Sequence, residues 1–169
     1  GNTPWTVLAE GIALTAEVWT IGEATFLVSI AVMFLWIPIK ETPGIGTILN
    51  IIIIALTIHV MVPILPQTEN FLVSILMASS GILLVGIGST MYLTANLGPG
   101  PRDGWMTGLQ RATGVPIGRV RITIEVSVLV IGIVLGGTFG IGTILFAVTI
   151  GPVVASCMSI ASRIDSTTR

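Results

Sequence analysis

The chain has 169 residues, of which 53% are hydrophobic and 9% are charged, and its formal net charge is −1. Soluble domains carry about 25% charged residues, so this composition excludes an ordinary soluble protein and indicates one membrane domain over residues 1–169. The single cysteine, Cys157, lies in an apolar run, which excludes a disulfide framework and a cysteine-based metal site.

Five stretches are apolar enough for helices that cross a bilayer, which takes about 20 residues. They are predicted at about 21–39, 45–65, 71–95, 120–135 and 141–160. Residues 5–12 are expected to form a short interfacial or re-entrant helix, and Trp36 is expected to anchor the end of the first span at the membrane interface. The predicted fold is therefore an all-α, polytopic helical membrane bundle.

Two breaks rich in Gly and Pro interrupt this pattern. Gly98-Pro99-Gly100-Pro101 follows the third apolar stretch, and Pro4-Trp5 stands in a similar context at the start. Such segments do not continue a helix, because Pro lacks a backbone donor and Gly has little conformational preference. We expect Asp103 to cap a short amphipathic helix over 104–112, and Gly114 to end it in the left-handed conformation.

Small residues recur at seven-residue spacing in the third apolar stretch, at Ser74, Gly81, Gly88 and Ala95. This pattern predicts a helix face that another helix can approach closely. The partner helix can belong to the same chain or to another protein, so the pattern is also compatible with a homo-oligomer.

The seven basic residues fall in alternate connections between the predicted spans. They are Lys40, then Arg102, Arg111, Arg119 and Arg121, then Arg163 and Arg169. The segments 1–20, 65–70 and 136–140 contain none. By the positive-inside rule, the basic side is assigned to the cytoplasm, which predicts a multi-pass protein of the plasma (inner) membrane with a cytoplasmic tail at 163–169.

An internal repeat accompanies the breaks. Residues 44–49, Gly-Ile-Gly-Thr-Ile-Leu, recur letter for letter at 140–145. Pro4 matches Pro101 at nearly the same offset, and Gly11 matches Gly108. This self-similarity predicts a duplication, with an incomplete first repeat at 1–65 and a second at 71–162. A three-span unit reverses its direction when duplicated, so we expect inverted repeats and six spans in the intact protein, of which five are present.

Several of these motifs resemble the YczE-like bacterial integral membrane proteins, to which the YitT-like membrane proteins are more loosely related. The motifs are Pro4-Trp5, Gly-Pro-Gly-Pro-Arg-Asp at 98–103, Arg121 with Glu125, and the segment 140–145. The resemblance covers nearly the whole chain except the family's first span, and it implies that the chain is truncated at its N-terminus. Thr6 stands where the family usually has Asp, and His59 where it usually has an acid. The resemblance implies an architecture rather than an activity.

The breaks also supply a candidate site. In inverted halves, two short helices would point their positive N-termini toward the middle, where they favour an anionic group. The predicted substrate-binding residues are Pro4, Trp5, Gly98, Gly100, Pro101, Arg102 and Asp103. In the alternative interpretation, Arg102 anchors the cytoplasmic interface and Asp103 only caps a helix.

Four polar residues inside or beside the spans are candidates for coupling or structural roles. Glu125 has Arg121 one helical turn before it, so it is either a proton- or cation-linked carboxylate or part of a structural ion pair. His59, the only histidine, either relays protons or hydrogen-bonds a neighbouring helix. Asn50 is expected to hydrogen-bond between helices. The structural alternative is favoured for all four residues.

No catalytic constellation, phosphate loop, metal-ligand spacing or basic nucleic-acid patch is present in the sequence. We therefore expect no enzyme activity, no cofactor, no metal and no nucleic acid, and the lipid bilayer as the main partner. The first hypothesis is a small-solute permease or exporter whose halves rock around the breaks. The alternative is a non-transporting membrane scaffold or regulatory partner. Convergence of Arg102, Glu125, Asn50 and His59 on one cavity would favour transport.

Overall fold

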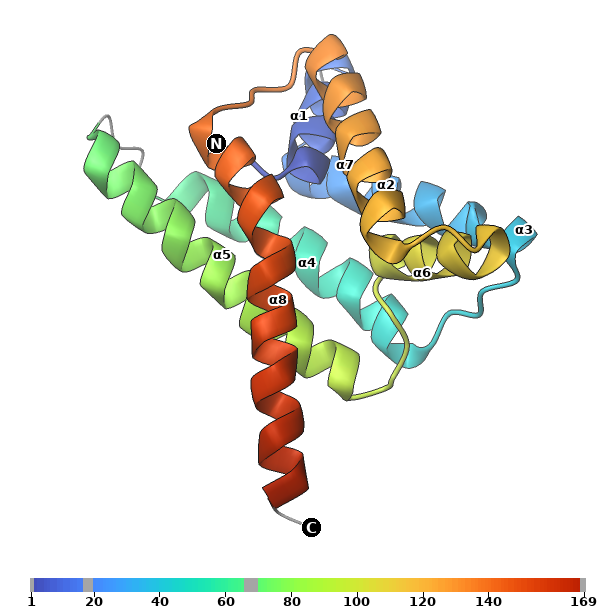
Figure 1. Ribbon diagram of the computed structural model, residues 1–169. Coiled ribbons are helices and arrows are strands. Elements are labelled where there is room, and N and C mark those ends of the chain that lie inside the picture. The colour runs from blue at the N-terminus through green and yellow to red at the C-terminus, as the bar shows by residue number, and fades with distance from the viewer. Residues whose placement is uncertain (1, 17–19, 66–69, 168–169) are drawn as a thin grey trace.

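The computed structural model describes residues 2–16, 20–65 and 70–167, and this part of the chain is helical. The helices are α1 (Pro4–Ala16), α2 (Ile21–Phe34), α3 (Trp36–Ile39), α4 (Ile45–Ile64), α5 (Phe71–Thr94), α6 (Pro101–Thr113), α7 (Ile117–Val134) and α8 (Ile141–Thr167). Figure 1 shows α6 lying across the end of α7, and α8 crossing α5 on its way to the C-terminus. The predicted all-α fold is therefore confirmed.

Three helices are individually long and apolar enough to cross a membrane, namely α4, α5 and the 141–163 part of α8. α1 and α2 together form a bent pair, with 111° between their axes, that would make a fourth. α2 has only 14 residues, and α7 carries Arg119, Arg121 and Glu125, so neither qualifies alone. These helices fit a membrane protein, although fewer of them qualify than the five that the sequence predicts.

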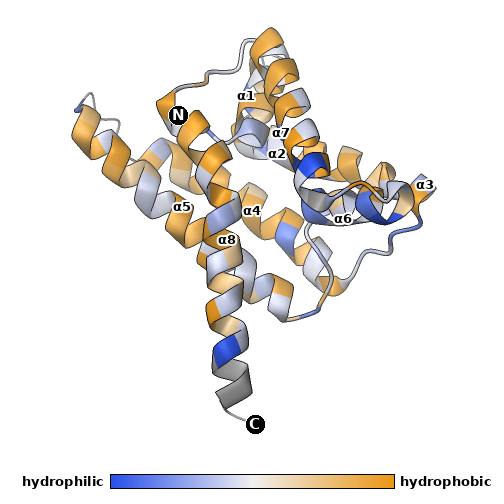
Figure 2. Ribbon diagram, in the orientation of Figure 1, coloured by the Kyte–Doolittle hydropathy of each residue, from blue (hydrophilic) through white to orange (hydrophobic). Residues whose placement is uncertain are grey.

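Apolar side chains cover the outer faces of these helices. Figure 2 shows hydrophobic residues along α4, α5 and α8 and hydrophilic ones gathered around α6. Large apolar side chains such as Ile53, Leu84 and Val148 are exposed in the isolated chain. In a bilayer the lipid covers such surface, because hydrocarbon is as apolar as these side chains.

The main core lies where α1, α2, α6 and α7 meet. Its buried residues are Trp5, Val28, Val32, Met106, Val120, Ile124 and Val128. α5 and α8 pack against each other at the close approach of Gly86 to Val153. The core therefore joins the two short helices that follow the breaks to the longer helices α2 and α7.

The break before α6 is close to the prediction, with one correction. Gly98 has a φ of +113°, Gly100 is the N-cap of α6, and Pro101 occupies its first turn. Asp103 therefore lies inside the first turn rather than at the cap, because proline is pre-organised for the first helical position and starts the helix earlier. Gly114 ends α6 in the left-handed conformation, with a φ of +69°, as predicted.

The two glycines of the seven-residue stripe face open space. A Cβ atom added at Gly81 or at Gly88 would have nothing within 4 Å. The face of α5 that is buried carries Ile82, Gly86 and Thr90, at spacings of four residues, and Gly86 meets Val153 of α8. Of the two alternatives left open by the sequence, packing within the chain is therefore not seen at Gly81 and Gly88, and a partner helix from another chain stays a prediction.

Candidate functional site

The two breaks meet in space. Trp5 lies in the first turn of α1 and is only 5% exposed. Arg102 lies in the first turn of α6, and its guanidinium carbon is 4.8 Å from the centroid of the Trp5 ring. A cation over an aromatic face at this distance is attracted by the ring quadrupole. The first turns of the two short helices, far apart in the sequence, are therefore in direct contact.

Glu125 of α7 completes this cluster. Arg121, Arg102, Asp103 and the Trp5 side chain all act on its carboxylate. Its Oε2 atom is buried and accepts no hydrogen bond from the described residues. Arg121, one turn earlier, therefore stabilises this oxygen through its charge and not through the close contact that the sequence predicts. A buried carboxylate oxygen without a partner is costly, so this atom is the most unusual one in the cluster.

Burial shifts the pKa values of Arg102 and Asp103, in the first turn of α6. α6 is not among the described helices that are able to span a membrane. Burial lowers the pKa of Arg102 to about 10, against the opposing attraction of Glu125. Arg102 thus stays charged at neutral pH. Burial raises the pKa of Asp103, partly offset by the charge of Arg121. Asp103 Oδ2 also accepts a hydrogen bond from Tyr92 Oη, which ties α6 to α5.

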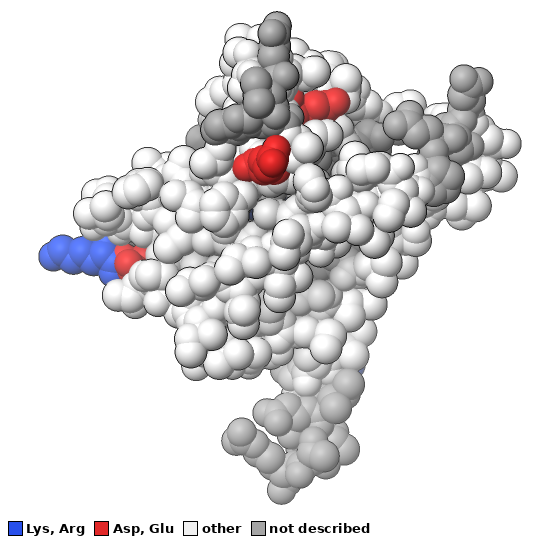
Figure 3. All heavy atoms as spheres, turned by 180° about the vertical axis from the view of Figure 1, so that it is seen from behind, with Lys and Arg blue, Asp and Glu red and all other residues white. Residues whose placement is uncertain are grey.

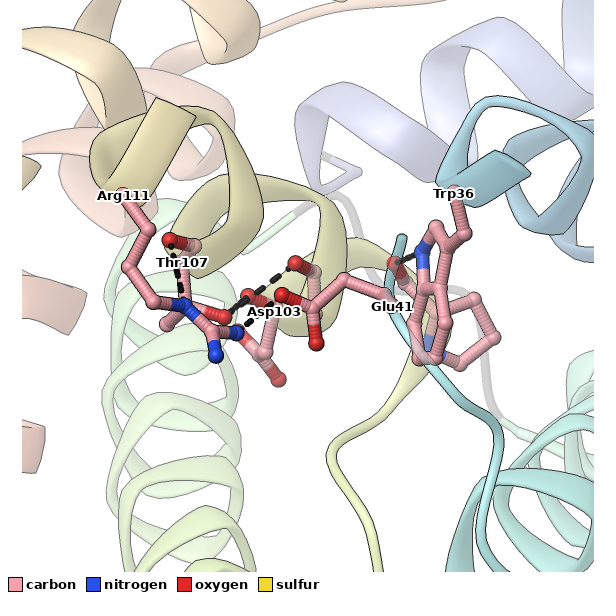
Figure 4. Close-up of polar contacts among 7 residues, drawn as sticks. Trp36, Glu41, Asp103, Thr107 and Arg111 are labelled. Atoms are coloured by element: carbon pink, nitrogen blue, oxygen red, sulfur yellow. Dashed lines mark hydrogen bonds and ion pairs between the residues drawn. The ribbon is translucent and has the colours of Figure 1, made fainter. Parts of the chain in front are cut away.

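Trp36 holds the start of α6 from the side of α2 and α3. Its Nε1 donates to the carbonyl oxygen of Pro101 over 2.9 Å, and the residue is 2% exposed. Figure 4 shows this contact beside the Asp103, Thr107 and Arg111 group of α6. The expected role of Trp36 as an interface anchor is wrong, because its ring fills the space over Gly104, where a Cβ atom would collide with it.

The first Gly-Ile-Gly-Thr-Ile-Leu segment, residues 44–49, binds the backbone of the break before α6. The Gly46 N–H donates to the Leu97 carbonyl over 2.8 Å. Thr47 Oγ1 donates to the Pro99 carbonyl over 2.7 Å and accepts from the Gly44 N–H at 3.1 Å. These bonds satisfy backbone groups that the Gly/Pro segment cannot pair internally, so the segment fixes the path of the chain into α6.

Asn50, one turn further along α4, packs directly against Gly100. A Cβ atom at Gly100 would lie 3.0 Å from Asn50 Oδ1. Its side chain therefore lies beside the break, and the predicted hydrogen bond between helices stays a prediction.

Two glycines of the short helices lie close to the ends of other helices. Gly108 of α6 lies under Ile39 and Glu41, while Gly11 of α1 lies under Leu135 and the backbone of Gly132. In the second Gly-Ile-Gly-Thr-Ile-Leu segment the Gly140 N–H donates to Thr143 Oγ1 at 3.2 Å, like its counterpart in the first. The matching sequence positions thus occupy matching environments.

Two polar contacts tie the connections to the short helices. Arg111 of α6 pairs with Glu41, in the connection before α4. Glu10 of α1 accepts from the Thr138 N–H over 2.9 Å and from the Asn2 amide. Figure 3 shows that, seen from behind, charged atoms are sparse on the surface, with acidic side chains in the upper part of the view and a basic side chain beside an acidic one at the left edge.

His59 lies apart from the cluster. Its Nδ1 is 3.1 Å from Thr20 Oγ1, next to Glu23 and a cleft between α2 and α4. Within the described ranges, no group of three His, Cys, Asp or Glu residues could hold a metal ion. The structure therefore brings together Trp5, Arg102, Asp103, Arg121 and Glu125, places Asn50 beside the break, and leaves His59 out.

Sequence reasoning missed three residues that position this cluster: Trp36, Thr47 and Tyr92. Thr47 carries a signal, since it occupies the same place as Thr143 in the repeated hexapeptide and both are fully buried. Trp36 and Tyr92 carry none, because an aromatic residue in an apolar stretch is equally compatible with lipid and with the protein interior.

The comparisons with known proteins agree on one family. Residues 1–159 match the model of a family of unknown function, DUF6198. A protein of Haemophilus influenzae described as an "Uncharacterized protein" is 44% identical over 164 residues, covering 97% of this chain and 75% of its own length. The "Uncharacterized membrane protein YczE" of Bacillus subtilis is 33% identical over 155 residues, covering 89% of this chain and 70% of its own length. No solved structure matches the chain.

Proposed function

The chain belongs to the DUF6198 family and is similar to the membrane protein YczE. From this premise we propose that it is a small-solute permease or exporter. The observation that carries the proposal is the contact between Trp5 and Arg102 next to the unpartnered Glu125 carboxylate oxygen. Charged residues within a membrane protein are costly and usually serve a substrate or ion pathway.

The proposal includes two inverted repeats. Its support is that each short helix reaches the other proposed repeat, since α1 packs on α7 as well as on α2, and α6 packs on α2 and α3 as well as on α7. Each break is then held in part by the other repeat. Discontinuous helices at the interface of two inverted repeats are where transporters of this kind bind their substrates. The architecture is an analogy, and the function is argued from the cluster itself.

The proposal also includes five crossings. α7 has 18 residues, a length of about 27 Å at 1.5 Å per residue, close to the roughly 30 Å of the hydrocarbon core. Its Arg119 and Arg121 lie near one end, where long side chains can reach the interface. α2 and α3 together cover the first predicted span, with Leu35 between them.

The contacts between connections support one orientation. Arg111 pairs with Glu41, and both belong to connections that the charge distribution places on one side. Glu10 and Thr138 are joined on the side without basic residues. We therefore propose a plasma-membrane protein with the Arg-rich connections and the C-terminus in the cytoplasm.

The solute that fits the cluster is a small anion. Arg102 is held over the face of Trp5, and its guanidinium is a cation that complements an anion. The N-terminus of α6 adds a partial positive charge at the same place. Glu125 competes for Arg102, and its protonation or rearrangement would free the cation for the solute.

The test is reconstitution of the protein in liposomes with a panel of small anions and neutral solutes. We expect flux of at least one anion, and its loss in Arg102→Gln. Arg111→Gln, which removes an equal charge from the exposed end of α6, should keep the flux. Equal flux in Arg102→Gln and the unmodified protein would refute the proposed role of the cluster.

A scaffold or regulatory role is the second candidate, with no transport cycle and no catalysis. It is favoured by the open small-residue face of α5, since neither Gly81 nor Gly88 has a neighbouring atom within reach. Such a face suits a helix of a second copy or of another membrane protein. Absence of flux for the whole panel, together with self-association through this face, would favour this candidate.

A further inference from the structure

A second site lies between α2 and α4, away from the Trp5–Arg102 cluster. It is a cleft of about 630 Å³ with mostly apolar walls, among them Phe26 and Leu27 of α2 and Ile52 and Leu56 of α4. Gly22 brings the two helices together beside it, since a Cβ atom there would lie 2.7 Å from His59 Cβ. Sites for small molecules are apolar hollows of about 300–1,000 Å³ with a few fixed polar groups, and this cleft has that form.

The polar groups of the cleft are Glu23 and His59, which a shared partner holds in place. Thr20 Oγ1 donates to Glu23 Oε2 over 3.0 Å, and the Thr20 N–H donates to the same oxygen over 2.8 Å. The Thr20 hydroxyl also accepts from the Glu23 N–H at 3.3 Å. This reciprocal arrangement is a capping box, so the carboxylate is fixed by the start of α2.

The same threonine joins the histidine to the carboxylate. Thr20 Oγ1 lies 3.1 Å from His59 Nδ1 and 3.0 Å from Glu23 Oε2. Glu23 and His59 both line the cleft. An ionised carboxylate only accepts hydrogen bonds, so the polar part of the cleft carries one anionic acceptor beside an imidazole.

We propose that this cleft binds an amphiphilic primary ammonium compound, with its apolar tail between α2 and α4 and its –NH₃⁺ group at Glu23 and His59. An ammonium group has three donors and no acceptor, which complements the acceptor-only carboxylate of Glu23. Charge-assisted hydrogen bonds to a carboxylate are the strong ones. A head that carries only negative charge would be repelled by Glu23, and an alcohol would lack the positive charge. The site shares no residue with the Trp5–Arg102 cluster and does not depend on the permease proposal.

Because His59 is the only histidine in the chain, the NMR signals of its imidazole report on this cleft alone. The protein, purified without a histidine tag and labelled with ¹⁵N-histidine, is placed in nanodiscs of phosphatidylcholine, which has no primary amine. Decylammonium is titrated while the His59 imidazole signals are recorded, with decanol and decanoate as matched probes of equal chain length. We expect saturable shifts with decylammonium, and binding at least about tenfold weaker for decanol and decanoate.

Two variants and one control complete the experiment. Glu23→Gln keeps the capping box, because glutamine also serves at that position, and should weaken decylammonium binding about tenfold. Leu56→Trp should block the cleft. Glu41→Gln removes an equal charge elsewhere and should leave binding unchanged. Equal affinity for decanol, or an unchanged affinity in Glu23→Gln, would overturn the proposal.

A further arm identifies the source of the ammonium group. Nanodiscs containing phosphatidylethanolamine present the same –NH₃⁺ chemistry as a lipid headgroup. If this lipid displaces decylammonium, the natural ligand is a lipid amine. If it does not, the ligand is a soluble amphiphilic amine. Both results support the site, while failure of decylammonium to perturb His59 in the phosphatidylcholine disc refutes it.

Discussion

The ring of Trp36 lies directly over the backbone of Gly104, so that the aromatic side chain occupies the space that any larger residue at 104 would need. The same indole donates to the Pro101 carbonyl at the start of the helix. Trp36, which follows α2, thus fixes both the position and the orientation of α6, the short helix after Gly98-Pro99-Gly100. The cluster around Arg102 depends on this contact.

Replacing Gly104 with Ala should destabilise the protein. The added methyl would collide with the Trp36 ring, and overpacking of this kind costs about 1–3 kcal/mol. Gly118, in the first turn of α7, is the matched control, since a Cβ atom there meets nothing within 4 Å. Gly118→Ala should be neutral or stabilising by up to about 1 kcal/mol. Thermal unfolding in detergent measures both, and equal effects of the two changes would contradict the close approach.

Replacing Thr47 with Val should also destabilise the protein. The change keeps the shape but removes the donor to the Pro99 carbonyl and the acceptor for the Gly44 N–H. Leaving buried polar groups without partners costs about 1–3 kcal/mol each. Thr57→Val on the exposed face of the same helix is the control and should cost less than about 0.5 kcal/mol. Chemical unfolding of the two variants is compared. A Thr47→Val protein as stable as the control would contradict a stabilising role of the Thr47 hydrogen bonds.

Trp5 and Arg102 should be energetically coupled. A double-mutant cycle with Trp5→Leu and Arg102→Gln should give a coupling free energy of about 0.5–2 kcal/mol, the usual range for a cation over an aromatic ring. The same cycle between Trp5 and Arg111 should give about zero, because Arg111 pairs with Glu41 instead. A Trp5–Arg102 coupling no larger than the Trp5–Arg111 value would mean that the two breaks do not interact in the membrane protein.

Asp103 should make stability depend on pH. Burial raises its pKa in the folded protein above the ordinary 3.8, so the folded state holds the proton more tightly than the unfolded state. Stability is then highest below about 3.8 and falls as the pH rises toward the raised pKa of the folded state. Asp103→Asn, whose amide oxygen can still accept from Tyr92, should flatten this part of the profile. The free energy of unfolding is measured from pH 3 upward for both proteins. A larger rise with pH in the unmodified protein than in Asp103→Asn would contradict the prediction.

Features that depend on local chemistry could be predicted from the sequence. Gly114 ends α6 in the left-handed conformation because few other residues adopt it at low cost. Trp5 and Arg102 could be assigned to one candidate site because each directly follows the proline of one of the two matching breaks. The start of α6 was predicted too late in the chain, at Asp103 instead of Gly100. Pro101 and Asp103 both favour the start of a helix, and only the backbone path of the break decides between them.

The sequence alone determined that this protein is helical and apolar, where its helices break, and that one hexapeptide is repeated. These features follow from local rules, since a bilayer requires hydrogen-bonded helices and Gly and Pro interrupt them. Only the tertiary structure decided which apolar faces pack together: Trp36 inward over Gly104, and Gly86 of α5 rather than Gly81 or Gly88 against α8. Lipid and protein interior are equally apolar, so hydrophobicity does not tell which face of a helix packs against protein and which faces lipid. The fit of particular side chains decides this.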